Sequence, residues 1–204
     1  MKNSYALSEV PTIRDMYERG VLKSQSHVDT VSIFQGDITK LNVDVIVNAA
    51  KADLLGGKGV DGAIHAAAGP QLRSECRKLK GCSVGDAKIT NGYELPAKYV
   101  IHTVGPIYSS RHSATCQNEL ASCYLTCLEL AVQHGLRTVA FPAISTGIYG
   151  YPLEEATHVA LASTRQFLYS KAGRQLKRVV FVAFDDKTNK VYESLIPQYF
   201  PYSN

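Results

Sequence analysis

Short apolar runs alternate along this chain with longer amphipathic segments, and this alternation restricts the fold more than any other sequence feature. The runs have the length of strands, and the segments between them have the apolar spacing of helices. They predict strands over residues 31–35, 43–48, 87–91, 99–104, 138–142 and 178–184. They predict helices over residues 13–18, 60–68, 71–79, 116–134, 152–170 and 188–196. The pattern therefore indicates the α/β class.

The strands of such a chain are expected to pair mostly in parallel, because each helix returns the chain to the same end of the sheet. The runs at 43–48 and 178–184 are apolar throughout, which is typical of strands covered on both faces. Ligands of such sheets bind at the carboxyl ends of the strands. Four loops in this position hold the unusual residues of the chain: 36–38, 48–59, 145–150 and 184–185.

The length of 204 residues supports one sizeable core, so we expect one principal domain. Residues 1–30 are interpreted as an N-terminal helical extension and residues 31–204 as that domain. Thr12 and Asp15 have the spacing of a capping box, and residues 24–29 are polar, as in a loop. The apolar runs are too short to span a bilayer, and we expect neither a signal peptide nor a membrane partner.

Charge and cysteine content narrow the expected partners. The formal net charge is +4, which suits an anionic ligand, and no run of Lys or Arg indicates a nucleic-acid-binding arm. The five cysteines form no C-x-x-C pair, so we expect buried, reduced thiols in a cytoplasmic or nuclear protein. We expect no zinc or other metal site and no cofactor. The cysteines are Cys76, Cys82, Cys116, Cys123 and Cys127.

Two glycine-containing loops stand between a strand and a helix, at residues 54–59 and 145–150. Glycine lets backbone N–H groups approach a phosphate closely, and a helix N-terminus adds a partial positive charge. Two such loops at one sheet edge could hold a diphosphate from both sides. Neither loop ends in the Gly-Lys-Ser/Thr of a nucleotide-triphosphate site. Tight strand-to-helix connections are the alternative explanation.

Four polar residues near these loops are candidates for chemistry, and each has a structural alternative. Asp37 could accept a hydrogen bond from an exocyclic amine or cap a turn. Asn48 could hold ribose hydroxyls or satisfy loop backbone groups. Asp61 lies in the first turn of a helix, where its structural role would be a favourable interaction with the helix dipole. His65 lies four residues later on the same face, and a single helical histidine is more often structural than catalytic.

His102 and Phe184 lie within or at the end of predicted strands. A histidine inside an apolar strand is more often a hydrogen-bonded core residue than a catalytic one. Phe184 could stack on a base, although core packing is the usual role of such a residue. Neither residue decides a function by itself.

Taken in order, several segments of the chain resemble the macrodomain family. They are Gly36-Asp37-Ile38-Thr39, Val47-Asn48-Ala49-Ala50, the stretch from Leu54 to His65, His102-Thr103-Val104-Gly105-Pro106, and the stretch from Pro142 to Pro152. The resemblance covers roughly residues 31–196 and is strongest to the MacroD-type members. It implies a three-layer α/β/α fold with a mixed, mostly parallel central sheet.

The resemblance implies a hydrolase that binds ADP-ribose and cleaves ADP-ribose esters. The implied reactions are removal of mono-ADP-ribose from acidic side chains and deacetylation of O-acetyl-ADP-ribose. The implied partners are these small molecules and mono-ADP-ribosylated proteins or nucleic acids, and we expect a monomer. A second hypothesis is a module that binds ADP-ribose with little or no turnover. A third is an ADP-ribose 1″-phosphate phosphatase.

The resemblance also implies where the ends of the ligand lie. Asp37 and the backbone of Ile38 would recognise the adenine, and Phe184 would stack on it. Two sets of backbone groups would hold the diphosphate: those of Gly57, Gly59 and Val60, and those of Ser145, Thr146, Gly147, Ile148 and Tyr149.

At the distal ribose the resemblance implies the catalytic group. Asn48 would contact this ribose, and Tyr149 would pack near the bond that breaks. Ala50 would be a further ligand-binding residue. Asp61 would orient the ribose or a water for attack at the anomeric carbon or its ester. His65 would support the loop that carries Asp61.

Lys51 departs from the family pattern, which usually has a second Asn at this position. A lysine side chain is longer, cationic and unable to accept a hydrogen bond. It could point outward, pair with Asp53 or Asp61, or contact the diphosphate or an anionic substrate. The first two arrangements would leave or weaken catalysis, and the third could strengthen binding. Lys58 also replaces a common Gly, at a position less tied to chemistry.

Overall fold

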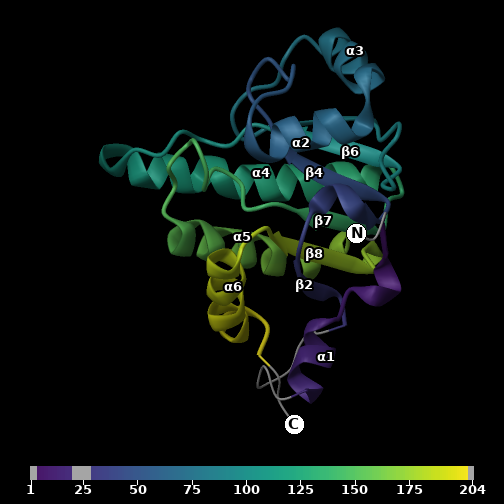
Figure 1. The fold of residues 1–204 in the computed structure, drawn as a ribbon. Helices are drawn as coiled ribbons and strands as arrows, with labels where there is room; N and C mark the ends of the chain where they lie inside the picture. The colour runs from purple at the N-terminus through teal and green to yellow at the C-terminus, as the bar shows by residue number, and fades with distance from the viewer. Residues whose placement is uncertain (1–3, 20–28, 202–204) are drawn as a thin grey trace.

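The computed structural model describes residues 4–19 and 29–201, and its centre is a six-stranded sheet (Figure 1). The strands are β2 Val31–Gln35, β4 Val45–Ala49, β5 Ala87–Asn91, β6 Tyr99–Thr103, β7 Thr138–Phe141 and β8 Arg178–Ala183. They lie in the order β2-β8-β7-β4-β6-β5. Neighbouring strands are parallel except β5 and β6, which are antiparallel. The prediction of a mixed, mostly parallel sheet is confirmed.

Helices cover both faces of the sheet. They are α1 Ile13–Glu18, α2 Gly59–Ala68, α3 Pro70–Lys78, α4 Ser113–Gln133, α5 Leu153–Leu168 and α6 Asp186–Tyr199. The buried apolar side chains of α2 and α3 belong to one cluster, and those of α1, α4, α5 and α6 belong to another. Figure 1 shows α2 and α3 toward the top of the view, with α1, α5 and α6 toward the bottom. Among the described residues, no helix is long and apolar enough to cross a membrane.

The two faces of the sheet explain why its central strands are apolar at every position. In β4, Val45 and Val47 pack into the cluster with α4 and α5, whereas Ile46 packs into the cluster with α2 and α3. In β8, Val179 packs into the cluster with α4 and α5, and Val180 packs into the cluster with α2 and α3. All five side chains are fully buried. A strand covered on both sides therefore appears in the sequence as a continuous run of apolar residues and not as an alternation of apolar and polar residues.

The loops with unusual residues meet at one edge of this sheet. Because β4 is hydrogen-bonded to β6 on one side and to β7 on the other, all in parallel, the loops after these strands leave the sheet side by side. β2 and β8 are also parallel neighbours, and Gly36 N donates to Ala183 O at 2.9 Å just beyond them. The four loops are thereby placed along one rim.

The predicted strands and helices agree with the structure to within three residues, and the strand predicted at 43–48 is β4, preceded by a short strand that was not predicted. Leu41–Asn42 form a short strand, β3, which pairs with β1 at Tyr5–Ala6, and β4 starts at Val45. The break lies at Asp44, whose carboxylate accepts hydrogen bonds from the backbone N of residues 137 and 138. The predicted start of α4 at residue 116 was three residues late.

The first described segment packs onto the rest of the domain. The predicted capping box at Thr12 is present at the start of α1. Ile13 is fully buried in the cluster that also contains α4 and α5, and the hydroxyl of Tyr17 donates to the backbone oxygen of Phe200 at 2.7 Å. Most of the loop predicted at 24–29 lies outside the described residues. The division of the chain at residue 30 stays a prediction, although α1 shares the main core.

All five cysteines are buried and unpaired. Burial raises the pKa of the Cys76 thiol and of the Cys123 thiol to about 11. Such thiols stay protonated at neutral pH and pack as small apolar groups. Their role in this fold is therefore packing.

Replacing Ile13 with Ala tests whether α1 belongs to the core. The change removes a fully buried side chain and should lower the free energy of unfolding by about 2–5 kcal/mol. Glu18→Ala, at an exposed position of the same helix, is the matched control and should change it by less than about 0.5 kcal/mol. Urea denaturation measures the free energy of unfolding of both variants. A loss in Ile13→Ala as small as that in Glu18→Ala would contradict the packing of α1 into the core.

Candidate functional site

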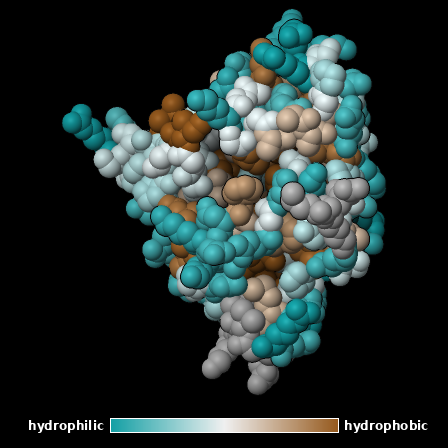
Figure 2. Space-filling model, in the orientation of Figure 1, coloured by the Kyte–Doolittle hydropathy of each residue, from teal (hydrophilic) through white to brown (hydrophobic). Residues whose placement is uncertain are grey.

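Two adjoining cavities open at the carboxyl edge of the sheet and form one cleft. They share Gly59, Val60, Ala143 and Gly147. The Asp61 cavity is further lined by Ala49, Ala50, Lys51, Lys58, Asp61, Gly105, Ile144, Ser145, Ile148 and Tyr149. The Phe184 cavity is further lined by Gly36, Asp37, Ile38, Ala63, Pro142, Thr146, Val182, Phe184, Asp185 and Thr188. Figure 2 shows a hollow near the centre of one face, with hydrophobic residues inside it and both hydrophilic and hydrophobic residues around it.

One wall of the cleft is the loop between β4 and α2. Leu54 is fully buried with a left-handed φ of 61°, and it anchors the loop in the core. Gly57 passes so close to the cavity that a Cβ there would lie 2.9 Å from Asp61 Oδ2 and 3.2 Å from Lys51 Cε. Gly59, with a φ of +63°, begins α2. Because the first N–H groups of a helix have no partner inside it, this wall brings backbone donors to the junction of the cavities.

The opposite wall is the loop that follows β7. Its shape is held by backbone hydrogen bonds from Tyr151 N to Ser145 O and from Gly150 N to Gly147 O, both at 3.0 Å. Tyr108 N donates to Tyr149 O at 2.9 Å, which ties the loop to the segment after β6. The two walls meet at small residues, where a ligand can contact backbone directly.

The Phe184 cavity brings together the residues that the sequence suggests for a base. Asp37 and Ile38 come from the loop after β2, and Phe184 follows β8. Phe184 is 82% exposed, so its ring is not a core residue and is free to stack. Asp37 also caps the turn, because its Oδ1 accepts from the backbone N and the hydroxyl of Thr39 at 2.9 and 2.7 Å. These bonds hold the carboxylate at the cavity wall.

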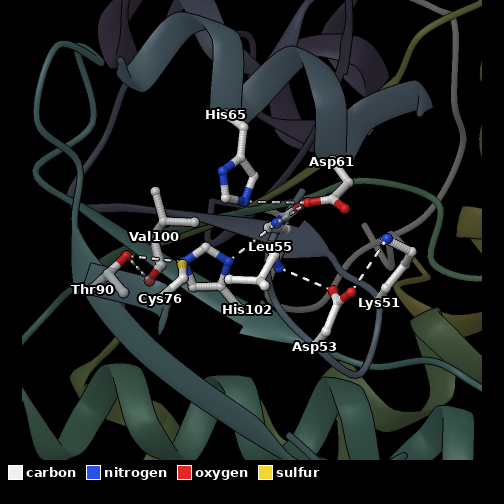
Figure 3. Close-up of polar contacts among 10 residues, drawn as sticks. Lys51, Asp53, Leu55, Asp61, His65, Cys76, Thr90, Val100 and His102 are labelled. Carbon is white, nitrogen blue, oxygen red and sulfur yellow. Dashed lines mark hydrogen bonds and ion pairs between the residues drawn. The ribbon is translucent and has the colours of Figure 1, made fainter. Parts of the chain in front are cut away.

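Asp61 lines the other cavity from the first turn of α2, yet it is 3% exposed. Its Oδ1 accepts a hydrogen bond from Asn48 Nδ2 at 2.8 Å and lies 3.5 Å from His65 Nε2 (Figure 3). Its Oδ2 has no hydrogen-bond partner among the described residues. The carboxylate is therefore held through one oxygen, and the other is buried and lacks a hydrogen-bond partner from the described residues.

Burial dominates the electrostatics of this group. Burial raises the pKa of Asp61 above its ordinary value, although the hydrogen bond from Asn48 and the charges of His65 and Lys51 oppose the shift. Burial also lowers the pKa of His65. Because both shifts favour neutral forms, the 3.5 Å contact is not a strong ion pair. His65 instead packs under the loop, since a Cβ at Gly56 would lie 3.2 Å from its ring.

Lys51 lines the Asp61 cavity but pairs with a different carboxylate. Its Nζ lies 3.5 Å from Asp53 Oδ2, and Figure 3 shows this contact as separate from the one between Asp61 and His65. Both partners are about half exposed, so the pair contributes little to stability. Asp53 also accepts from Leu55 N at 3.0 Å, and this bond is the main cause of its lowered pKa. Of the arrangements that the sequence leaves open for Lys51, the structure shows the ion pair with Asp53.

Behind Asp61 lies a buried group of His102, Thr90 and Cys76. His102 Nδ1 is 3.1 Å from Asn48 Nδ2, and its Nε2 is 2.9 Å from Thr90 Oγ1 and 3.6 Å from Cys76 Sγ. His102 is therefore the hydrogen-bonded core histidine that the sequence suggests. Burial lowers its pKa to about 3.

His65, Cys76 and His102 also offer ligand atoms within 4.8 Å of one another, a spacing that a metal ion could use. The chemistry of the group opposes this use. A metal requires the thiolate of Cys76, whose pKa burial raises to about 11. His102 Nε2 already has Thr90 as a partner. We interpret the cluster as a hydrogen-bonded core.

Most site residues proposed from the sequence line the cleft, but three do not. Asn48 is fully buried and holds Asp61 from behind, so its predicted contact with a ribose stays a prediction. Gly57 and His65 line a separate hollow behind the loop, together with Arg73. Sequence reasoning missed several lining residues, among them Lys58, Gly105, Ala143, Ile144, Asp185 and Thr188. Their positions just after strands or in the next helical turn could have indicated them.

Known proteins are similar to this chain over most of its length. The family model named Macro domain matches residues 47–160. The mouse (Mus musculus) protein named ADP-ribose glycohydrolase MACROD1 is 54% identical over 173 residues, which is 85% of this chain and 53% of that protein. Macro domain-containing protein CT2219 of Chlorobaculum tepidum is 51% identical over 166 residues, which is 81% of this chain and 95% of that protein. The chain thus spans about half the length of the mouse relative.

Solved structures share the fold. The macro domain of ganglioside induced differentiation associated protein 2 has a TM-score of 0.91 and 37% identity, with all of both chains covered. A Trypanosoma brucei macrodomain in complex with ADP-ribose has a TM-score of 0.84 and 39% identity, covering 96% of this chain and 78% of that one. The likeness therefore extends over the whole architecture and not over the cleft alone.

Asp61→Asn should stabilise the protein at pH 7. Because burial raises the pKa of Asp61, its ionised form is disfavoured in the folded state. An amide removes the charge, and its oxygen can still accept from Asn48. We expect thermal unfolding to show a rise in Tm of about 2–4 °C, equivalent to about 1 kcal/mol.

The gain should shrink as the pH falls through the folded pKa of Asp61 and vanish below its unfolded pKa, where both states are protonated. Asp53→Asn is the matched control. The pKa of Asp53 is lowered, so loss of its charge should not raise the Tm. A lower Tm for Asp61→Asn than for the native protein at pH 7 would contradict the account of a disfavoured buried charge.

Proposed function

The chain belongs to the macrodomain family, and from that premise we propose that it binds ADP-ribose in the cleft and hydrolyses ADP-ribose esters. The proposed reactions are the release of mono-ADP-ribose from acidic side chains and, by the same chemistry, the deacetylation of O-acetyl-ADP-ribose. Two observations support the ligand class. The mouse relative is named an ADP-ribose glycohydrolase, and the trypanosomal structure is a complex with ADP-ribose.

The two cavities suit a ligand with a base at one end and a sugar at the other. Phe184 would stack on the adenine, and Asp37 would accept from its exocyclic amine. The diphosphate would lie at the residues that both cavities share, Gly59 and Gly147 among them. Backbone donors and a helix N-terminus stabilise an anion in that position. The distal ribose would then occupy the Asp61 cavity.

The observation that carries the hydrolytic part of the proposal is the state of the Asp61 carboxylate. It is buried, held by Asn48 and unpaired at Oδ2. Such a group can orient a ribose hydroxyl or a water and accept a proton. In the proposed step a water attacks the anomeric carbon or the ester carbonyl carbon, and the ester bond breaks. The products are ADP-ribose and the free acid.

Lys51 is the feature that would favour a binding module without turnover. Its ammonium group pairs with Asp53 and not with Asp61, so the carboxylate keeps its hydrogen bond from Asn48. Its aliphatic part adjoins Gly57 beside the Asp61 cavity. We therefore favour hydrolysis over binding alone.

We further propose that the targets are proteins mono-ADP-ribosylated on Asp or Glu, and that the protein acts as a monomer in the cytoplasm or nucleus. The five buried free cysteines support a reducing compartment. ADP-ribosylated nucleic acid is a second class of target, and a modified oligonucleotide tests it in the same release assay.

Asp61→Ala should abolish release of ADP-ribose from a peptide mono-ADP-ribosylated on Glu. Loss of a group that orients the nucleophile lowers kcat by about 10²–10⁴-fold, whereas ADP-ribose binding, measured by calorimetry, should weaken far less. The native rate should fall on acidification, because the pKa of Asp61 is raised above the ordinary 3.8 and the carboxylate must be ionised. An unchanged rate in Asp61→Ala, or tight binding without release by the native protein, would contradict the proposal.

Lys51→Asn should change kcat in the same assay by less than about fivefold. The ammonium group of Lys51 takes part in an exposed pair worth at most about 1 kcal/mol, and the Asp61 carboxylate does not depend on it. Lys58→Gly, on the same cavity wall, is the matched control for loss of one positive charge. A gain of much more than tenfold in Lys51→Asn alone would mean that Lys51 suppresses turnover and would favour the binding module.

A further inference from the structure

We propose that Thr90 and His102 are positioning residues, which set the amide orientation of Asn48 and, through it, the orientation of the Asp61 carboxylate. The kinetic part of this inference rests on the proposed hydrolysis. Its structural part does not, because it concerns hydrogen bonds of the protein alone.

The amide nitrogen of Asn48 lies between two acceptors. Asn48 Nδ2 is 2.8 Å from Asp61 Oδ1 and 3.1 Å from His102 Nδ1. An amide NH₂ group has two hydrogens, so it can donate to both. It can donate to His102 only if Nδ1 of that ring carries no proton. The amide orientation therefore depends on the tautomer of His102.

Thr90 selects this tautomer. A neutral imidazole with a free Nδ1 carries its proton on Nε2, and Thr90 Oγ1 lies 2.9 Å from Nε2 as the acceptor. Thr90 Oγ1 also lies 3.5 Å from Val100 O, to which its hydroxyl can donate, and an oxygen lone pair then remains for His102. Cys76 Sγ, at 3.6 Å from the same nitrogen, is a weaker partner. In this arrangement Asn48 donates to His102, His102 donates to Thr90, and Thr90 donates to Val100 O.

His102 acts here by orientation and not by proton transfer. It is fully buried, and burial lowers its pKa to about 3, so the ring stays neutral over the working range of pH. The titratable groups around it are Cys76, whose pKa is raised to about 11, and His65, with ring centroids 6.1 Å apart. Asn48 links it to Asp61 by hydrogen bonds.

The opposite tautomer would disturb the Asp61 carboxylate. A proton on His102 Nδ1 would face the NH₂ group of Asn48, donor against donor. The amide would turn, and Asn48 Oδ1 would then face Asp61 Oδ1, two acceptors at hydrogen-bond distance. In a buried site such a mismatch is expensive, so the carboxylate would move or take up a proton.

The test compares Thr90→Val, which keeps the shape of the side chain but removes the acceptor, with Thr90→Ser, which keeps the hydroxyl. ¹⁵N NMR of the imidazole reports the tautomer of His102, and ¹³C NMR of the carboxyl group reports the pKa of Asp61. We expect the native protein and Thr90→Ser to carry the proton on Nε2. In Thr90→Val we expect the tautomer to change and the pKa of Asp61 to rise by about one unit. We also expect kcat to fall about tenfold, with KM little changed.

Cys76→Ala is the matched control, because it removes a contact with the same ring nitrogen but no strong acceptor. It should lower stability by leaving a cavity, while the tautomer and kcat stay native. A native tautomer in Thr90→Val, or an equal loss of kcat in Cys76→Ala, would overturn the proposal. If the native protein releases no ADP-ribose at all, the proposed function fails, and the two NMR measurements alone decide the role of Thr90 and His102.

Discussion

Parallel pairing of β4 with β7 on one side and with β6 on the other is the constraint on which the rest of the site depends. It places the loop before α2 next to the loop after β7, so their backbones face each other across the cleft. The same pairing sets Asn48 of β4 directly opposite His102 of β6 in the register. Both the cleft and the buried group behind it thus follow from which strands are neighbours.

Within this frame, Asp61 is held at the expense of stability. A buried carboxylate with one unpaired oxygen is disfavoured by the fold, and its raised pKa reflects that. Charged groups kept in this way are concentrated at functional sites, because a group that is fully satisfied by the protein has nothing left to offer a ligand. By contrast, Asp53 is exposed and bonded to Leu55 N and Lys51, and its pKa is lowered.

The sequence predicted the layers and the loops that line the cleft, because these depend on local periodicity and on glycine-containing loops. It did not predict the break at Asp44, which follows from hydrogen bonds to residues about ninety positions away. It could not place Asn48 beneath Asp61 or against His102, since these contacts join residues 13 and 54 positions apart. The sequence left both stacking on a base and core packing open for Phe184, and the exposure of this side chain in the structure decides against core packing.

The most direct test of the account is a crystal structure of this chain with ADP-ribose. We predict electron density for the adenine against Phe184, for the diphosphate between Gly59 and Gly147, and for the distal ribose within hydrogen-bond distance of Asp61 Oδ2. A diphosphate bound elsewhere, or a ligand that leaves the space between the two loops unoccupied, would contradict the claim that the two backbone walls form the binding site.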